Sequence, residues 1–233
     1  MLFLLIHGAW HGGWAWQAVA ERLRMRSHEV HAPDLPGLGA DAENLSPTIG
    51  LEDHIEAVLQ DVPHLLCAHS YGGMIARAIV DRRPHLIEGL VLIEALWPSN
   101  GQRALDLLAP AARSETERTI RNDGDGWRIP VPNVERFAIP DPETAAAVGQ
   151  RLTPHPAKTF TDKIDLQAPS PLGTYLIAND REPQPYAETA ARLGAEGWTV
   201  QAASGGHELM LTQPDFVAAA LFAAAEKNRK DVR

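Results

Sequence analysis

The feature that most constrains the fold is a junction between an apolar run and a helical pattern at residues 67–73, Cys-Ala-His-Ser-Tyr-Gly-Gly. Residues 62–67 are short, apolar and contain a proline near their start, which predicts a buried strand. Beyond the junction, apolar side chains recur at helical spacing: Met74, Ile75, Ala78 and Ile79. A serine between a strand and a helix lies in a tight, strained turn that lifts its hydroxyl out of the sheet. The segment therefore predicts a strand–turn–helix unit with Ser70 at its apex.

Ser70 also has the sequence context of a catalytic nucleophile. Gly72 and Gly73 are small enough for the backbone to turn sharply, and the helix after them would place N–H groups where negative charge develops. The pattern matches the G-x-S-x-G nucleophile elbow, except that Ala68 replaces the first glycine. A methyl group is the least costly replacement there. An ordinary turn serine is the alternative interpretation.

A serine hydroxyl needs a base that takes its proton and an acid that orients the base. On this scaffold the expected chain order is nucleophile, acid, histidine. His207 ends a glycine-rich turn after the apolar run 198–203, so we predict it as the base. Asp180 follows the apolar run 172–178, so we predict it as the acid. All three residues lie at or just past the C-terminal ends of strands, where open α/β sheets place their sites.

Two other carboxylates compete with Asp180 for the role of the acid. Glu94 ends the apolar run 89–93 and could reach the histidine from the neighbouring strand, and Glu182 lies two residues beyond Asp180. We place Asp180 first and Glu94 second. For Glu94 we expect a buried position or one at the pocket edge, with hydrogen bonds to backbone N–H groups.

The loop after the first apolar run is the predicted second half of an oxyanion site. Residues 2–6 are continuously apolar, as in a strand buried on both faces, and they lead into the glycine-rich segment 7–14. We predict that the backbone N–H of Ala9 pairs with that of Tyr71 to bind the oxyanion. A loop whose tryptophans serve packing is the alternative. His7 and His11 would suit a metal only on a helix, which the glycines disfavour, so we expect no metal site.

Four motifs together resemble the α/β-hydrolase superfamily: I-H-G-A-W-H-G-G-W at the start, H-S-Y-G-G at the elbow, A-N-D-R, and G-G-H-E-L-M-L-T-Q-P near the end. Within it, the chain is similar to the small-lid branch of plant methylesterases, hydroxynitrile lyases and bacterial carboxylesterases, including pyrethroid-hydrolase-like enzymes. The resemblance runs from Leu2 to about Ala225 and is weakest between Ser99 and Leu166. It implies a triad of Ser70, His207 and Asp180, with no cofactor.

Residues that differ from those of related enzymes limit the reactions that we expect from this chain. Hydroxynitrile lyases of this branch carry a threonine after the first histidine and a lysine after the catalytic one, where this chain has Gly8 and Glu208. The lysine stabilises departing cyanide and a carboxylate would repel it, so cyanohydrin cleavage is not expected. Ser70, rather than an aspartate or a cysteine at the elbow, favours acyl transfer.

The spacing of apolar runs predicts an α/β fold with about six mostly parallel strands and helices on both faces. The runs lie at residues 2–6, 28–32, 62–68, 89–94, 172–178 and 198–203, with helical patterns at 15–26, 51–60, 71–83, 185–194 and 214–227. A proline- and glycine-rich interval interrupts this rhythm after the fourth strand. We therefore predict a core domain at 1–97 and 169–233 with an inserted lid at 98–168. A decorative surface excursion is the alternative.

Composition limits the class of partner. The 233 residues carry a formal charge of −9 without a basic cluster, so nucleic acid and acidic membranes are poor partners. The single cysteine, Cys67, is expected to be a core thiol. No signal peptide or membrane span is evident in the sequence, so we expect a cytoplasmic location. The oligomeric state stays open.

These observations predict a serine carboxylesterase that acts through an acyl-enzyme on a small-molecule ester. Apolar and aromatic side chains are expected to line its pocket and to favour a small to medium hydrophobic substrate. The candidates are Trp10, Trp97, Trp127, Phe137 and Phe160. Two alternatives stay open: a cofactor-free lyase or cyclase in which His207 takes a proton from carbon, and a receptor that binds a ligand without turnover.

Overall fold

The computed structural model describes residues 1–181 and 184–231, which form a six-stranded parallel sheet in the order β2-β1-β3-β4-β7-β8. The strands are β1 (Leu2–Ile6), β2 (Glu29–His31), β3 (His64–His69), β4 (Ile87–Ile93), β7 (Thr174–Ala178) and β8 (Thr199–Ala203). The predicted fold class is thus confirmed, and each predicted strand differs from the observed one by only a few residues at its ends.

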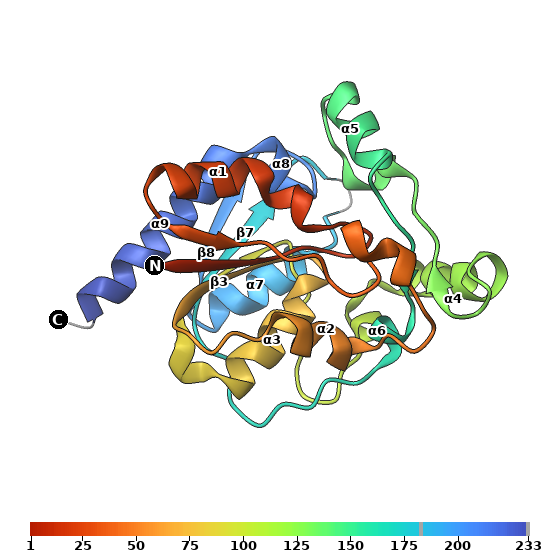
Figure 1. Ribbon diagram of the computed structural model, residues 1–233, viewed down its shortest axis with the longest axis horizontal. Coiled ribbons are helices and arrows are strands. Elements are labelled where there is room, and N and C mark those ends of the chain that lie inside the picture. The colour runs from red at the N-terminus through yellow and green to blue at the C-terminus, as the bar shows by residue number, and fades with distance from the viewer. Residues whose placement is uncertain (182–183, 232–233) are drawn as a thin grey trace.

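Helices cover both faces of this sheet (Figure 1). On one face lie α1 (Gln17–Met25), α8 (Leu209–Thr212) and α9 (Pro214–Asp231), and on the other lie α2 (Leu51–Val58), α3 (Gly72–Arg82) and α7 (Ala187–Ala195). Successive strand residues point to opposite faces, so Leu4 and Ile6 join the core beneath α3 while Phe3 and Leu5 join the core beneath α1 and α9. Burial on both faces explains why the central strands are continuously apolar.

Alternation along β3 also decides the environment of Cys67, which points into the core on the α1 and α9 side. Its side chain is completely buried, and burial raises the pKa of the thiol. The structure therefore agrees with a core thiol, as expected from the sequence.

Three short 3₁₀ segments also lie in the parts of the chain that form the sheet and its covering helices: Gly13–Trp16, Gly39–Asn44 and Pro84–Leu86.

The chain between β4 and β7 forms a separate group of small elements. These are a 3₁₀ turn at Ala104–Leu107, α4 (Pro110–Asp123), β5 (Arg128–Ile129), a 3₁₀ turn at Val134–Phe137, α5 (Pro142–Gly149), β6 (His155–Pro156) and α6 (Lys158–Thr161). Strands β5 and β6 pair in antiparallel fashion. Figure 1 shows α4 and α5 beyond the carboxyl ends of the sheet strands, on the side opposite the N-terminus. That this insertion works as a lid stays a prediction.

The described helices include none with the length and apolar character needed to cross a membrane. The cytoplasmic location stays a prediction.

Candidate active site

Ser70 lies between β3 and α3 with a positive φ of 52°. Such a backbone conformation is uncommon for a residue with a side chain and is found at strained functional turns. The two glycines after the serine are required by close packing. A Cβ at Gly72 would lie 2.8 Å from the carbonyl oxygen of His7, and one at Gly73 would press into the carbonyl oxygen of Leu96. The elbow therefore fits tightly between the loop after β1 and the chain after β4.

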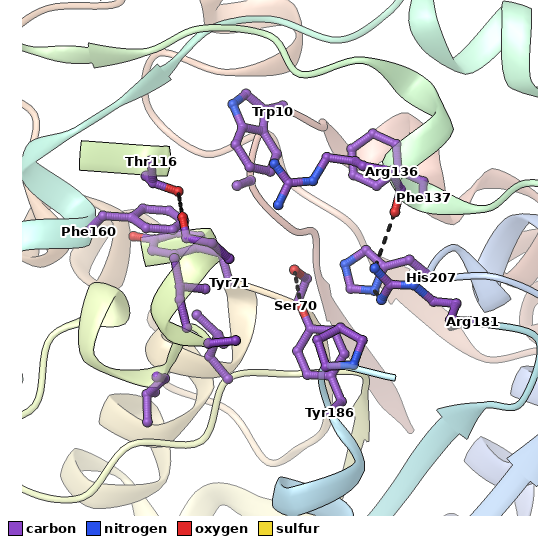
Figure 2. Close-up of a pocket in the computed structure, with 17 residues that line it drawn as sticks. Trp10, Ser70, Tyr71, Thr116, Arg136, Phe137, Phe160, Arg181, Tyr186 and His207 are labelled. Carbon is purple, nitrogen blue, oxygen red and sulfur yellow. Dashed lines mark hydrogen bonds between the residues drawn. The ribbon is translucent and has the colours of Figure 1, made fainter. Parts of the chain in front are cut away.

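His207 is held beside Ser70 by backbone and ring contacts. Its N–H donates to the carbonyl oxygen of Phe137 at 2.8 Å. Its imidazole stacks on the ring of Tyr186, with centroids 5.2 Å apart and planes 7° apart, and on that of Phe137 at 6.1 Å and 9°. Figure 2 shows the imidazole beside the Ser70 hydroxyl, with Phe137 and Tyr186 on either side. The ring plane is thus fixed by two aromatic neighbours.

The carboxylate that contacts His207 is that of Glu94, not Asp180. Nδ1 of His207 lies 2.9 Å from Oε2 of Glu94. Asp180 instead accepts a hydrogen bond from the backbone N–H of Gly205 at 2.7 Å. Our placement of Asp180 against the histidine is therefore corrected. The reason lies in the register: Ile93 pairs with Leu176, so Glu94 is one residue past this pair and Asp180 is four residues past it.

Glu94 is completely buried, and both of its carboxylate oxygens accept hydrogen bonds. Oε1 accepts from the N–H of Ala178 and from Nε2 of Gln184, each at 2.9 Å. Oε2 faces Nδ1 of His207 and accepts from Arg181 at 3.0 Å. Four donors therefore fill the acceptor positions of one carboxylate and fix its orientation. The backbone hydrogen bond that the sequence led us to expect for Glu94 is one of the four.

Asp180 affects the site indirectly, through the turn that carries His207. Its N–H donates to the carbonyl oxygen of Gly205 at 3.2 Å, and its carboxylate accepts from the N–H of the same residue. These two bonds extend the contact between β7 and β8 past the ends of the strands. Asp180 therefore fastens the turn at residues 204–206. The third carboxylate considered, Glu182, lies outside the described residues.

The loop after β1 fixes the direction of the Ala9 N–H. Nδ1 of His7 donates to the carbonyl oxygen of Gly8 at 2.8 Å, while Nε2 accepts from the N–H of Leu35 at 3.1 Å. Because a peptide group is planar and trans, the N–H of Ala9 points away from the held carbonyl of Gly8. Within the described part of the chain, this N–H donates to no acceptor.

The peptide between Ser70 and Tyr71 is held in the same way. The carbonyl oxygen of Ser70 accepts from the N–H of Leu96 at 2.9 Å and from that of Gly73 at 3.1 Å. The N–H of Tyr71 consequently points to the opposite side, and among the described residues it too has no acceptor. Ala9, Ser70 and Tyr71 line one cavity. Two directed N–H groups are therefore available near the serine.

The cavity has a volume of about 700 Å³ including its open mouth, which is within the usual range for small-molecule pockets. Three of the five predicted aromatic residues line it: Trp10, Phe137 and Phe160. Trp97 and Trp127 do not, and these two expectations are corrected. Trp97 packs against Trp198 and donates its indole N–H to Ser170, which faces it away from the cavity. Trp127 lies at the outer strand β5, beneath the guanidinium of Arg128.

Comparisons with known proteins identify the family of this chain. Residues 3–220 match the model of the alpha/beta hydrolase family. The chain belongs to this family. It is 30% identical to the carbendazim hydrolyzing esterase of Nocardioides sp. (strain SG-4G), over 95% of this chain and 98% of that protein. It is 34% identical to methyl jasmonate esterase 1 of Vitis vinifera, over 41% of this chain and 40% of the relative.

Two solved structures superpose on this chain over nearly its whole length and have the same fold. An extracellular alpha/beta-hydrolase from a Paenibacillus species superposes with a TM-score of 0.83 at 23% identity, covering 96% of this chain and 98% of the other. A pyrethroid hydrolase from Sphingobium faniae superposes with a TM-score of 0.70 at 19% identity, covering 97% of each chain. Together with the esterases above, these matches confirm the predicted family and the predicted enzyme class, a carboxylic ester hydrolase.

Sequence reasoning missed four residues of the hydrolase site: Arg136, Arg181, Gln184 and Tyr186. Tyr186 places its hydroxyl 3.5 Å from Oγ of Ser70. Arg181 and Gln184 follow Asp180 closely in the chain, so the segment after β7 does contribute to the site, through other side chains than the one expected. Nothing in the periodicity around these residues distinguishes them from an ordinary polar loop.

Behind His207 lies a second group of buried titratable side chains. Nε2 of His69 lies 3.1 Å from the carbonyl oxygen of His207 and donates to it. The carboxyl oxygens of Glu208 lie 3.5 Å from Nε2 of His11 and 3.9 Å from Nε2 of His69. Ligand-type atoms of His69, His207 and Glu208 fall within 4.8 Å of one another. A cation there would compete with the hydrogen bonds of His69 to His207 and of His207 to Glu94.

Glu208 is a completely buried carboxyl group, and neither of its oxygens has a hydrogen-bond partner among the described residues. Burial raises the pKa of Glu208 to about 8 and lowers that of His11 to about 4. At neutral pH this arrangement therefore holds a protonated carboxyl next to a neutral imidazole.

This raised pKa predicts a specific pH dependence of stability. A folded-state pKa above the unfolded value means that the folded chain holds one extra proton between about pH 4.5 and about pH 8, so stability falls as pH rises through this window. Glu208→Gln removes the titration and keeps the size of the side chain. We expect the unfolding free energy of the wild type to fall relative to that of the variant, by up to about 1.4 kcal/mol per pH unit. Urea unfolding of both proteins across this range measures the difference, and parallel curves would contradict the prediction.

Proposed function

We propose that this chain is a serine carboxylesterase in which Ser70 is the nucleophile, His207 the general base and Glu94 the acid that orients it. The observation that carries this proposal is the 2.9 Å contact between Nδ1 of His207 and the buried, four-donor carboxylate of Glu94, on an imidazole that lies beside the strained Ser70 turn. In serine hydrolases, a carboxylate in this position selects the tautomer whose Nε2 is free to accept a proton.

In this proposal His207 takes the proton of Ser70 as the hydroxyl attacks the ester carbonyl. The N–H groups of Ala9 and Tyr71 bind the oxyanion, which costs little reorganisation because both peptides are already held by their carbonyls. The protonated imidazole then donates to the departing alcohol. A water molecule activated by His207 finally hydrolyses the acyl-enzyme and releases the acid. The stacked rings of Phe137 and Tyr186 keep the imidazole in one plane throughout.

A small to medium ester with an apolar portion is the substrate that we propose. Most of the cavity lining is apolar or aromatic. One relative is named as an esterase that hydrolyses carbendazim and another as a methyl jasmonate esterase, and we extend to this chain only the class of reaction that both names give, ester hydrolysis.

The packing around Gly8 argues against the cyanohydrin-lyase variant of this chemistry. A Cβ at Gly8 would lie 2.8 Å from Nδ1 of His69 and 3.0 Å from Cβ of Ser70. The threonine that the lyases carry here would therefore need a rearranged loop. Turnover of an ester distinguishes the esterase from the two remaining alternatives, a lyase or cyclase and a receptor.

Loss of the Ser70 hydroxyl is expected to abolish ester hydrolysis. Initial rates on p-nitrophenyl acetate, butyrate and octanoate measure this, with Ser70→Ala compared against the wild type and against Ser99→Ala, an exposed serine outside the cavity. Equal rates in the wild type and Ser70→Ala would remove Ser70 as the nucleophile. A folded wild type without turnover, but with tight retention of a ligand, would favour the receptor.

The two carboxylates are expected to differ sharply in kinetic effect. Glu94→Gln replaces an acceptor by an amide that can present an N–H to Nδ1 of His207, which favours the wrong tautomer, so kcat should fall by about 10³- to 10⁴-fold. Asp180→Asn keeps an oxygen that can accept from Gly205, and its kcat should stay within a few-fold of the wild type. Steady-state kinetics of both variants on p-nitrophenyl butyrate decide between them. A larger loss in Asp180→Asn would return Asp180 to the role of the acid.

The pH dependence of the rate follows from the environment of His207. Burial, and next the charge of Arg181, lower the pKa of His207 well below the usual value for a histidine. A lowered pKa keeps the imidazole neutral, and therefore basic, at more acidic pH. We expect kcat/KM for a neutral ester to rise with pH at the acid end and to reach its plateau below about pH 6.5. A profile measured from about pH 4.5 to about pH 8.5 tests this, and a midpoint above about pH 7 would contradict it.

A further inference from the structure

Two arginines, Arg136 and Arg181, line the cavity, and the described part of its lining contains no aspartate or glutamate. Arg136 belongs to the 3₁₀ turn at Val134–Phe137 in the insertion, and Arg181 follows β7. The two side chains differ in what balances their charge.

The charge of Arg181 is balanced inside the protein. Its guanidinium donates to Oε2 of Glu94 at 3.0 Å, and a second nitrogen donates to the backbone carbonyl of Arg136 at 3.2 Å. Because Glu94 also contacts His207, Arg181 belongs to the network that positions the base. It is consequently not free to bind a substrate without disturbing that network.

Arg136 has no such partner: none of the ion pairs among the described residues includes it. Its Cζ lies 5.2 Å from the ring centroid of Trp10, which supports the flat guanidinium by a cation–π contact. Arg136 is exposed as a residue, while the cavity walls around its guanidinium partly desolvate it and lower its pKa. In Figure 2 the side chain extends between Trp10 and Ser70 into the cavity. A guanidinium that lines the cavity and takes part in no ion pair among the described residues can attract an anionic group of a bound ligand.

We propose that Arg136 binds a carboxylate of the substrate, and that the enzyme prefers short esters that carry a free carboxylate, such as half-esters of dicarboxylic acids. This inference rests on the proposed esterase function and specifies its substrate class. A guanidinium presents parallel N–H donors that match the two oxygens of a carboxylate. The single unbalanced cation fits a single negative charge. Its position between Trp10 and Ser70 sets the carboxylate beside the reacting ester, without giving it a part in the bond changes.

A matched pair of substrates isolates the effect of the charge. Monoethyl glutarate and its neutral analogue ethyl 4-carbamoylbutanoate have the same length and the same ester group, and differ only in carboxylate against amide. We expect the wild type to show a kcat/KM ratio in favour of the half-ester. Arg136→Gln removes a hydrogen bond between charged groups. We expect this loss to reduce the ratio by at least about tenfold, mainly through a higher KM for the half-ester. The rate on the amide ester is the reference for each protein, so any general effect of the substitution cancels in the ratio.

Two further arginine variants separate binding from general effects. Arg151→Gln is the matched control, because Arg151 also stacks on a tryptophan, Trp14 at 4.4 Å, but does not line the cavity. Its substrate ratio should equal that of the wild type. Arg136→Lys retains the charge and should recover part of the preference. Melting temperatures establish that each variant is folded, and the ratio within one variant is independent of the fraction of active protein.

The outcomes distinguish this inference from the function on which it rests. If the wild type and Ser70→Ala hydrolyse each of the two esters at the same rate, the esterase proposal fails. If the wild type hydrolyses both esters but Arg136→Gln leaves the ratio unchanged, the esterase stands and the carboxylate site is overturned. Glu182→Gln tests the acidic residue next to Arg181 that lies outside the described residues. If a preference for the half-ester appears in Glu182→Gln but not in the wild type, the proposal is also overturned. The charge of Arg136 would then be balanced by a carboxylate of the chain itself.

Discussion

The carboxylate of Glu94 is the interaction on which the rest of the site depends. It receives hydrogen bonds from β7 and the loop directly after it, and from the turn after β8, so it joins the chain after β4 to two segments that are far away in the sequence. A buried carboxylate is tolerated only when its acceptor positions are filled, and here four donors fill them. The orientation of His207 is thereby fixed by a group that is itself fixed.

Backbone strain is present at the same edge of the sheet. Of the six described residues other than glycine that have a positive φ, three follow strands of the central sheet: Trp10, Ser70 and Glu94, with φ angles of 66°, 52° and 42°. A parallel sheet ends its strands at one edge, and sharp turns there aim side chains and N–H groups into a common space. The cost of these conformations is offset by the core beneath them, where every residue of β1 and β3 is buried.

The insertion takes part in the construction of the site as well as lying beside it. The N–H of His207 donates to the carbonyl of Phe137, Arg181 donates to that of Arg136, and the N–H of Thr153 donates to that of Trp10. These contacts tie His207, Arg181 and the loop after β1 to one segment. Changes in the insertion are therefore expected to alter both the shape of the cavity and the position of His207.

The sequence by itself determined the fold class and the sharp turn at Ser70, and it pointed to His207 and the glycine-rich loop after β1, because these depend on local patterns: apolar runs, glycines at sharp turns and the order of motifs. The tertiary structure decided which carboxylate contacts His207, since Glu94 and Asp180 both follow strands and only the register between β4 and β7 separates them. It also decided which aromatics face the cavity, excluding Trp97 and Trp127, and it brought Arg136 and Tyr186 to the site. Side-chain direction and contacts between distant segments are not encoded in periodicity, so only the folded chain could specify them.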